Sequence, residues 1–292
     1  MKKNRIIEEV IKPSSSHMVG DGFKVVNYHP GGQGFNKRMS PFFLLDFNAE
    51  ATFPPTDKPR GVGVHPHRGF ETVTIAYKGS VAHNDSSGNT GIINPGDVQW
   101  MTAGSGLLHK EYHEKEYAKR GGAFQMVQLW VNLPRKFKMT TPKYQAILHS
   151  QKGKFNLEND SGTVYVIAGD YHGAKGAAST YSPVEVYDIR LNTEGAVKLN
   201  FPATYNAGIL VIDGEVIVNG TTPVPQYHYI QFGNEPGEII VKASKNSILL
   251  VLSGEPINEP VAAYGPFVMN TVEEIQAAID DLNNGKFGKL AD

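Results

Sequence analysis

Apolar and polar side chains alternate over short stretches through most of the chain. Residues 71–77 place β-branched and aromatic side chains at a period of two and stop at Gly79, and residues 123–131 form an apolar, strand-like run that stops before Pro134. Runs of this length, bounded by Gly and Pro, are typical of β-strands. The same pattern predicts further strands over residues 164–167, 184–191, 209–212, 215–218, 239–241 and 248–252. Many short strands with regular turns indicate a mainly β barrel or sandwich.

One segment near the end of the chain has the period of a helix instead. Thr271 and Glu274 have the spacing of a capping box, and Asn-Asn-Gly at residues 283–285 supplies a stop. Between them, four apolar residues recur on one helical face, namely Val272, Ile275, Ile279 and Leu282. We predict a short docking helix that carries no chemistry.

A short internal repeat suggests two domains. Residues 65–71 lead into an apolar strand and Gly79, and residues 201–207 lead into a similar strand and Gly214, with one residue deleted. We interpret these stretches as two copies of one β-unit, joined near residues 134–142. Phe201 and Ala203 replace the two histidines of the first copy. We therefore expect one domain over residues 1–140 and a second, carrying the helix, over residues 141–292.

Composition narrows the class of protein. Of the 292 residues, 40% are hydrophobic and 20% are charged, which is ordinary for a folded globular protein. A formal net charge of −1 gives no indication of a nucleic acid or an acidic membrane as partner. No apolar run reaches the roughly 18 residues that span a bilayer, and no signal sequence is recognisable, so we expect a cytoplasmic protein. The lack of cysteine excludes disulfides, thiolate ligands and cysteine nucleophiles.

Two pairs of polar residues have the spacing of metal ligands. His65 and His67 are two residues apart, so both side chains point to one face of an extended chain, and His109 and Glu111 repeat that spacing. Two neighbouring strands would present all four to one point. Three imidazoles and one carboxylate suit Fe, Mn, Co, Ni, Cu or Zn rather than Ca or Mg, and leave two octahedral positions open. Either pair alone would be interpreted more simply as surface turn residues or a solvated pair, but both together favour a metal site.

Glu71 shares the strand parity of the histidine pair, and three roles are open to it. It would compete with Glu111 as a ligand, support the ligands by hydrogen bonding, or lie buried and paired. We expect His83 to pair with Asp85 in a loop and His113 to lie at the surface.

At these residues the chain resembles the pirin family of bicupins. The resemblance touches most of the chain and rests on five motifs: HPHRGFETVT at residues 65–74, GDVQWMTAG at 96–104, HKE at 109–111, QLWVNLP at 128–134 and GPFVMNT at 265–271. Arg60 and Gly104 depart from the general cupin pattern, at positions where that pattern has Gly and Pro, and pirins share these departures.

The resemblance implies a fold and a site. It implies two tandem cupin barrels, with a metal-binding barrel over residues 1–140 and a metal-free barrel plus helix over residues 141–292. The family's metal ligands carry over onto His65, His67, His109 and Glu111, and Glu71 then supports them without binding the metal. Iron is the metal that the resemblance favours, with manganese, nickel, cobalt, copper or zinc as alternatives.

The resemblance also implies an activity, because family members resemble quercetinases, which open a flavonol ring with O2 at a single metal ion. A flavonol would lose its enolic proton to Glu111, which would act as both ligand and general base. Four apolar residues near the motifs are candidates to contact this aromatic substrate, namely Phe43, Phe70, Trp100 and Met126. We therefore expect a quercetin 2,3-dioxygenase-like enzyme that uses an aromatic substrate and O2.

Two other functions remain compatible with the same residues. One is a metal- or redox-sensing regulatory protein that binds a protein partner without turnover. The other is a metal site that only stabilises the barrel. Eukaryotic pirins act as nuclear cofactors, but no basic stripe or cluster is present here to favour a nuclear role or nucleic acid binding.

Overall fold

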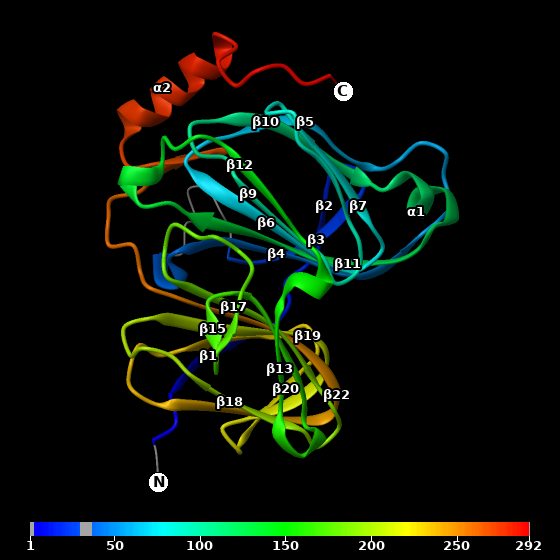
Figure 1. Ribbon diagram of the computed structural model, residues 1–292, viewed down its shortest axis with the longest axis vertical. Coiled ribbons are helices and arrows are strands. Elements are labelled where there is room, and N and C mark those ends of the chain that lie inside the picture. The colour runs from blue at the N-terminus through cyan, green and yellow to red at the C-terminus, as the bar shows by residue number, and fades with distance from the viewer. Residues whose placement is uncertain (1–2, 30–36, 292) are drawn as a thin grey trace. The chain divides into compact units, whose positions relative to one another are not determined.

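The computed structural model describes residues 3–29 and 37–291, and the chain divides into two compact units. The first barrel comprises Ser14–Lys37, Pro41–His149 and Ile257–Asp292, and the second barrel comprises Met1–Pro13, Arg38–Ser40 and Ser150–Pro256. Antiparallel strands make up most of each unit (Figure 1). The predicted mainly β fold with two barrels and one C-terminal helix is confirmed.

Two sheets form the first barrel. One has four strands in the order β5-β10-β7-β8, and the other has seven in the order β12-β9-β6-β11-β4-β3-β2. Its elements are β2 (His17–Val19), β3 (Phe23–His29), β4 (Phe42–Phe53), β5 (Gly61–His67), β6 (Phe70–Lys78), β7 (Val81–Asp85), β8 (Thr90–Ile93), β9 (Val98–Thr102), β10 (Leu107–His113), α1 (Lys115–Arg120), β11 (Gly122–Asn132), η3 (Arg135–Phe137), β12 (Lys143–Ile147), η4 (His149–Gln151, which runs into the second unit), β23 (Ala262–Tyr264), β24 (Phe267–Met269) and α2 (Val272–Asn283).

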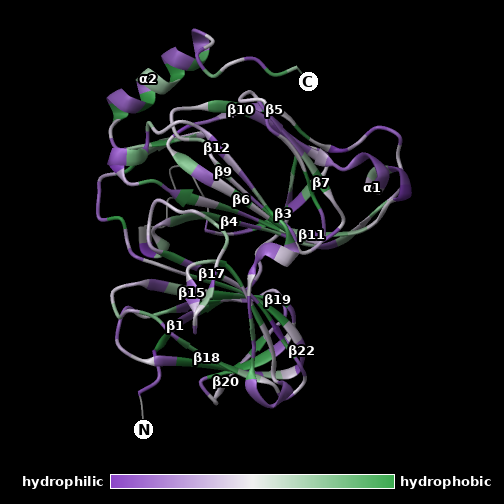
Figure 2. Cartoon of the chain, in the orientation of Figure 1, coloured by the Kyte–Doolittle hydropathy of each residue, from purple (hydrophilic) through white to green (hydrophobic). Residues whose placement is uncertain are grey.

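The second barrel is built on a nine-stranded sheet with an apolar core. The two longest strands, β19 and β22, pair along most of their length, and Figure 2 shows hydrophobic stretches in both. Its elements are β1 (Ile7–Ile11), the short η2 (Lys37–Met39), β13 (Gly153–Asn156), η5 (Glu158–Asp160), β14 (Gly162–Ala168), β15 (Asp170–Tyr171), β16 (Ala174–Lys175), β17 (Val184–Leu191), β18 (Ala196–Asn200), β19 (Asn206–Val218), β20 (Thr222–Pro225), β21 (Tyr229–Phe232) and β22 (Glu238–Gly254).

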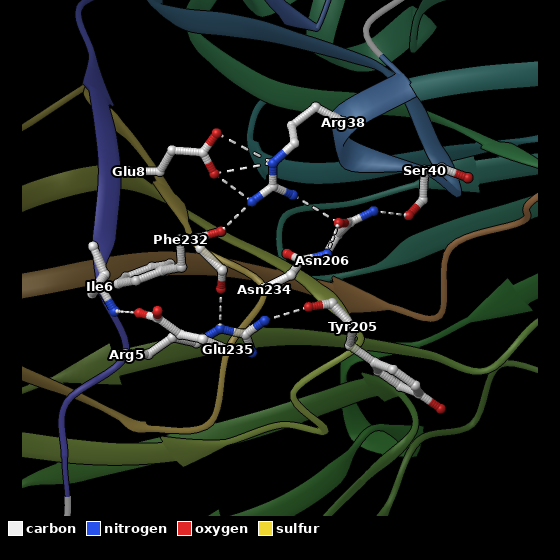
Figure 3. A network of polar contacts seen from close by, with 11 residues as sticks. Arg5, Ile6, Glu8, Arg38, Ser40, Tyr205, Asn206, Phe232, Asn234 and Glu235 are labelled. Carbon is white, nitrogen blue, oxygen red and sulfur yellow. Dashed lines mark hydrogen bonds and ion pairs between the residues drawn. The ribbon is translucent and has the colours of Figure 1, made fainter.

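The start of the chain is built into the second barrel rather than the first. Strand β1 pairs with β21, and the buried Arg5 donates from Nε to the carbonyl oxygen of Gly233 at 2.6 Å. Arg38 pairs with Glu8 and donates from Nη1 to Oδ1 of Asn206 at 2.7 Å (Figure 3). Two arginines bound to backbone and side-chain oxygens, one of them buried, fix this segment in place.

The end of the chain belongs to the first barrel. Helix α2 begins at the predicted capping box of Thr271 and Glu274 and packs Ile275 and Ala278 against strand β24 and Phe287, whereas Val272 of the predicted apolar face is exposed. Its Asp281 pairs with the buried Arg68 at 2.9 Å. This grouping differs from the expected division at residues 140 and 141, which placed the helix in the second domain. An apolar stripe shows that a helix packs, but it carries no information about which barrel it covers.

None of the helices in the described part of the chain is long and apolar enough to cross a membrane.

Candidate metal centre

Strands β5 and β10 bring the three predicted histidines together. The strands pair antiparallel with His65 opposite His109 and His67 opposite Leu107. One ring nitrogen of each of the three histidines lies within 4.8 Å of those of the other two. The ring centroids of His65 and His109 are 4.2 Å apart, and those of His67 and His109 are 4.7 Å apart. Period-two spacing on two neighbouring strands therefore produces one cluster of imidazoles inside the barrel.

Glu111 lies beside this cluster and is held by donors from three strands. Its Oε1 accepts from Oγ1 of Thr74 at 3.1 Å and from Nε2 of Gln99 at 3.4 Å, and its Oε2 accepts from Nε2 of Gln128 at 2.8 Å. A β-bulge separates His109 from Glu111 in the pairing with β5. Glu111 shares a second group of candidate ligand atoms with His109 and His83, again within 4.8 Å of one another. The carboxylate is therefore oriented before anything binds.

The buried imidazoles are suited to a metal ion. Burial lowers the pKa values of His67 and His109 well below the usual value for histidine, with neighbouring histidines adding to the effect, so both rings are neutral and keep a lone pair. Both ring nitrogens of His109, and Nδ1 of His67, lack a hydrogen-bond partner among the described residues. Buried polar atoms without partners are costly, and a bound metal would satisfy one nitrogen on each ring.

His65 is fixed in the tautomer that metal binding requires. Its Nδ1 is 2.8 Å from the carbonyl oxygen of Gly63, which can only accept, so Nδ1 donates. The lone pair then lies on Nε2, as in metal-bound histidines whose other nitrogen is hydrogen-bonded to a carbonyl.

His83 is a further histidine of this region, and its place corrects the sequence interpretation. It lies on strand β7 opposite Glu111, is buried, and is held by Asp85, with Nε2 and Oδ2 3.2 Å apart. Its ring stacks on Tyr144. The pair is thus part of the barrel interior rather than a surface loop. The alternation of Val81, His83 and Asp85 along one strand was the signal that indicated an inward face.

His113 is buried as well, not exposed as expected. It is bound through Nε2 to the carbonyl oxygen of Gly22 at 2.8 Å and packed against the rings of Phe53 and Phe124. It continues the inward-facing row of β10 that contains His109 and Glu111.

Glu71 does not support the cluster, contrary to the sequence prediction. It accepts from Oγ1 of Thr102 at 2.7 Å, while Thr74, three residues along the same strand, faces Glu111. Side chains an odd number of residues apart lie on opposite faces of a strand, so Glu71 points away from the site. The parity argument failed because the turn at Gly69, with a φ of +89°, separates β5 from β6. Burial raises the pKa of Glu71 to about 7.

A cavity of about 330 Å³ opens onto the candidate site. Its wall is mostly apolar but contains His65, His67 and Glu111. The remaining lining residues are Val19, Phe23, Val25, Leu44, Asp46, Asn48, Val62, Met126, Gln128, Trp130 and Pro266. A cavity of this size and composition is typical of a site for a small organic molecule.

Comparison with known proteins places the chain in a family. The Pirin family model matches residues 22–131, and the model described as the pirin C-terminal cupin domain matches residues 186–288. Human pirin is 38% identical over 86% of this chain and 84% of its own length. The chain belongs to the pirin family. The division found above gives this pirin two cupin barrels, of which the first contains every group of three candidate ligands found among the described residues.

Two bacterial relatives are more similar to this pirin. A crystal structure titled quercetin 2,3-dioxygenase from Acinetobacter baumannii is 46% identical and superposes with a TM-score of 0.93, covering 100% of each chain. A Pseudomonas aeruginosa protein with a provisional quercetin 2,3-dioxygenase name is 45% identical over 94% of this chain and 95% of its own.

The cavity of this pirin has a different wall from the one predicted. Of the four predicted pocket residues, Met126 lines it, whereas Phe43 and Phe70 pack into a buried cluster with Val268. Trp100 pairs with Val73, on the face of the sheet that carries Glu71. Three residues of strand β11 line the cavity, namely Met126, Gln128 and Trp130. Which face of β11 is turned to the cavity depends on the strands that pair with it.

Proposed function

We propose that this pirin is a metal-dependent dioxygenase of the quercetin 2,3-dioxygenase type, which opens a flavonol-like ring with O2. The observation that supports the proposal most strongly is a cluster of three imidazoles, two of them buried, beside an oriented carboxylate; of these groups His65, His67 and Glu111 line a cavity sized for a small aromatic molecule. The quercetin 2,3-dioxygenase from Acinetobacter baumannii supports the proposal, because it is 46% identical to this chain.

In this proposal His65, His67, His109 and Glu111 hold one transition metal ion. Three imidazole nitrogens and one carboxylate oxygen form a donor set for iron, and equally for manganese, nickel, cobalt, copper or zinc. A metal bound there would supply electron transfer between a flavonol anion and O2. Which of these metals binds in the cell depends on availability as much as on affinity.

Glu111 accepts the enolic proton of the substrate. It lines the cavity, and both of its oxygens are already oriented by donors from Thr74, Gln99 and Gln128. A fixed carboxylate within reach of a hydroxyl acts as a general base, and the deprotonated flavonol is more electron-rich and more readily oxidised.

The apolar wall keeps the reacting region dry. Phe23, Val25, Leu44 and Trp130 surround the cavity, so an aromatic substrate would displace water from it on binding. Excluding water strengthens the electrostatic effect of the carboxylate and limits side reactions of an oxidised substrate.

Oxygen uptake with quercetin, on protein whose metal content has been quantified, tests the proposal. We expect uptake in proportion to bound metal, with release of carbon monoxide. Glu111→Gln is expected to keep the metal and lose turnover. Glu71→Gln, which changes a buried carboxylate on the opposite face of the sheet, is expected to retain turnover. A fully metallated protein without uptake would contradict the proposal and favour a metal-sensing protein that binds a partner.

A further inference from the structure

Two polar side chains lie in the cavity wall away from the candidate metal ligands. Asp46 and Asn48 are on strand β4, both are buried, and both line the cavity. Asp46 is opposite Gln128 on strand β11, and Gln128 in turn donates to Glu111. Asp46 and Asn48 therefore line the same cavity as Glu111. They lie on β4, which is one strand further along the sheet from Glu111 than β11 with its Gln128.

The polar side chain of Asn48 has no partner among the described residues that would explain it. Its side chain is 2% exposed, and neither Oδ1 nor Nδ2 has a hydrogen-bond partner among the described residues. Its cross-strand neighbours are Val25 on β3 and Met126 on β11, which offer no side-chain donor or oxygen acceptor. A buried amide with both ends unsatisfied is unfavourable unless a ligand or water completes it, so Asn48 points to a bound polar group.

Only one oxygen of the Asp46 carboxyl group accepts a hydrogen bond from a described residue. Its Oδ1 accepts from Nδ2 of Asn27 on strand β3, and Oδ2 has no hydrogen-bond partner among the described residues. Asn27 therefore fixes the orientation of the carboxyl group and leaves one oxygen for a ligand. Burial raises the pKa of Asp46 to about 7, so near neutral pH the group is able to accept or to donate.

We infer that Asp46 and Asn48 form a second polar subsite of the cavity, which binds ring hydroxyl groups of a phenolic ligand remote from the group that faces Glu111. This inference rests on the proposed function. Hydroxyl groups both donate and accept, which matches an amide with one donor and one acceptor beside a carboxyl group. A mostly apolar wall with polar groups at this point, apart from those around Glu111, would select aromatic ligands by the position of their hydroxyls.

The test compares two ligands that share the group expected at the metal. Quercetin and 3-hydroxyflavone both have the 3-hydroxyl and 4-carbonyl groups, but only quercetin has further ring hydroxyls. Dissociation constants are measured in the absence of O2 on metal-loaded protein by quenching of tryptophan fluorescence, since Trp130 lines the cavity. The readout is the ratio of the two constants, which does not depend on turnover.

We expect Asn48→Leu, a change of similar volume, to reduce the preference for quercetin about tenfold while 3-hydroxyflavone binds as before or more tightly. Asp46→Asn is a milder second variant, which is expected to reduce the preference for quercetin by a smaller factor. Leu44→Ala is the matched control on the same strand, because loss of apolar wall should weaken both ligands by a similar factor.

An unchanged ratio in both variants, with quercetin still bound and oxidised, would overturn the subsite and leave the proposed function intact. Failure of quercetin to bind the metal-loaded wild-type protein would overturn both.

Discussion

Gln128 on strand β11 donates a hydrogen bond of 2.8 Å from Nε2 to Oε2 of Glu111 on strand β10. The two strands belong to different sheets, so this bond crosses the interior of the first barrel. It fixes the carboxylate between the imidazole cluster and the cavity, both of which the proposed chemistry requires.

Replacing Gln128 by Leu is expected to lower kcat for quercetin about tenfold, because a hydrogen bond to a charged group is worth roughly 1.5–3 kcal/mol. The four candidate ligands are unchanged, so the metal content should remain near that of the wild type. Steady-state oxygen uptake and elemental analysis on the same sample check both statements. Equal kcat values for the two proteins would show that Gln128 does not orient the base.

His83 and Asp85 are expected to support the metal site from the side away from the cavity. His83 lies opposite Glu111, and its ring centroid is 5.4 Å from that of His109. Substituting His83→Gln, or Asp85→Asn, should weaken metal binding by roughly 10- to 100-fold, the effect usual for groups that position ligands. Competition with a chelating dye measures this, and His172→Gln, an exposed histidine of the second barrel, is the control. Unaltered affinity would assign His83 to packing alone.

Glu71 is expected to make stability depend on pH. Burial raises its pKa to about 7 in the folded protein, whereas the unfolded value is near 4.5, so between these values folding takes up a proton. Stability from this group is complete below pH 4.5 and is lost as the pH rises through 7, by at most about 3 kcal/mol. Glu71→Gln should therefore melt at a higher temperature than the wild type at pH 8, with a smaller difference at pH 5. A difference independent of pH would contradict the titration.

Lys138 is expected to be essential for the turn between the histidine pair and strand β6. It is buried, and Nζ donates to the carbonyl oxygens of Gly69 and Val268 and to Oδ1 of Asn132, at 2.6–2.9 Å. Lys138→Met leaves three buried acceptors without this donor, which should destabilise the protein by about 3 kcal/mol. Thermal unfolding measures the loss, with the exposed Lys136→Met as control. Similar melting temperatures for the two variants would show that the acceptors find other donors.

Local patterns predicted much of the fold and the central cluster. Period-two alternation placed strand β6 near residues 71–77, and the Thr271 capping box marked the start of α2. The same period brought His65, His67 and His109 together, because two residues along a strand return to the same face. Glu71 was misplaced because that rule holds only within one strand, and a turn with positive φ at Gly69 intervenes.

The sequence by itself determined several of the strands, the C-terminal helix, the two β-units and the residue types that meet near His109, because each depends on neighbours a few residues apart. Only the tertiary structure decided that β1 belongs to the second barrel, that α2 packs on the first, and that Asn48 lies in the cavity wall. Those features depend on which strands pair and which faces they bury. Pairing is set by the summed packing of residues that are distant in the chain, so no local pattern records it.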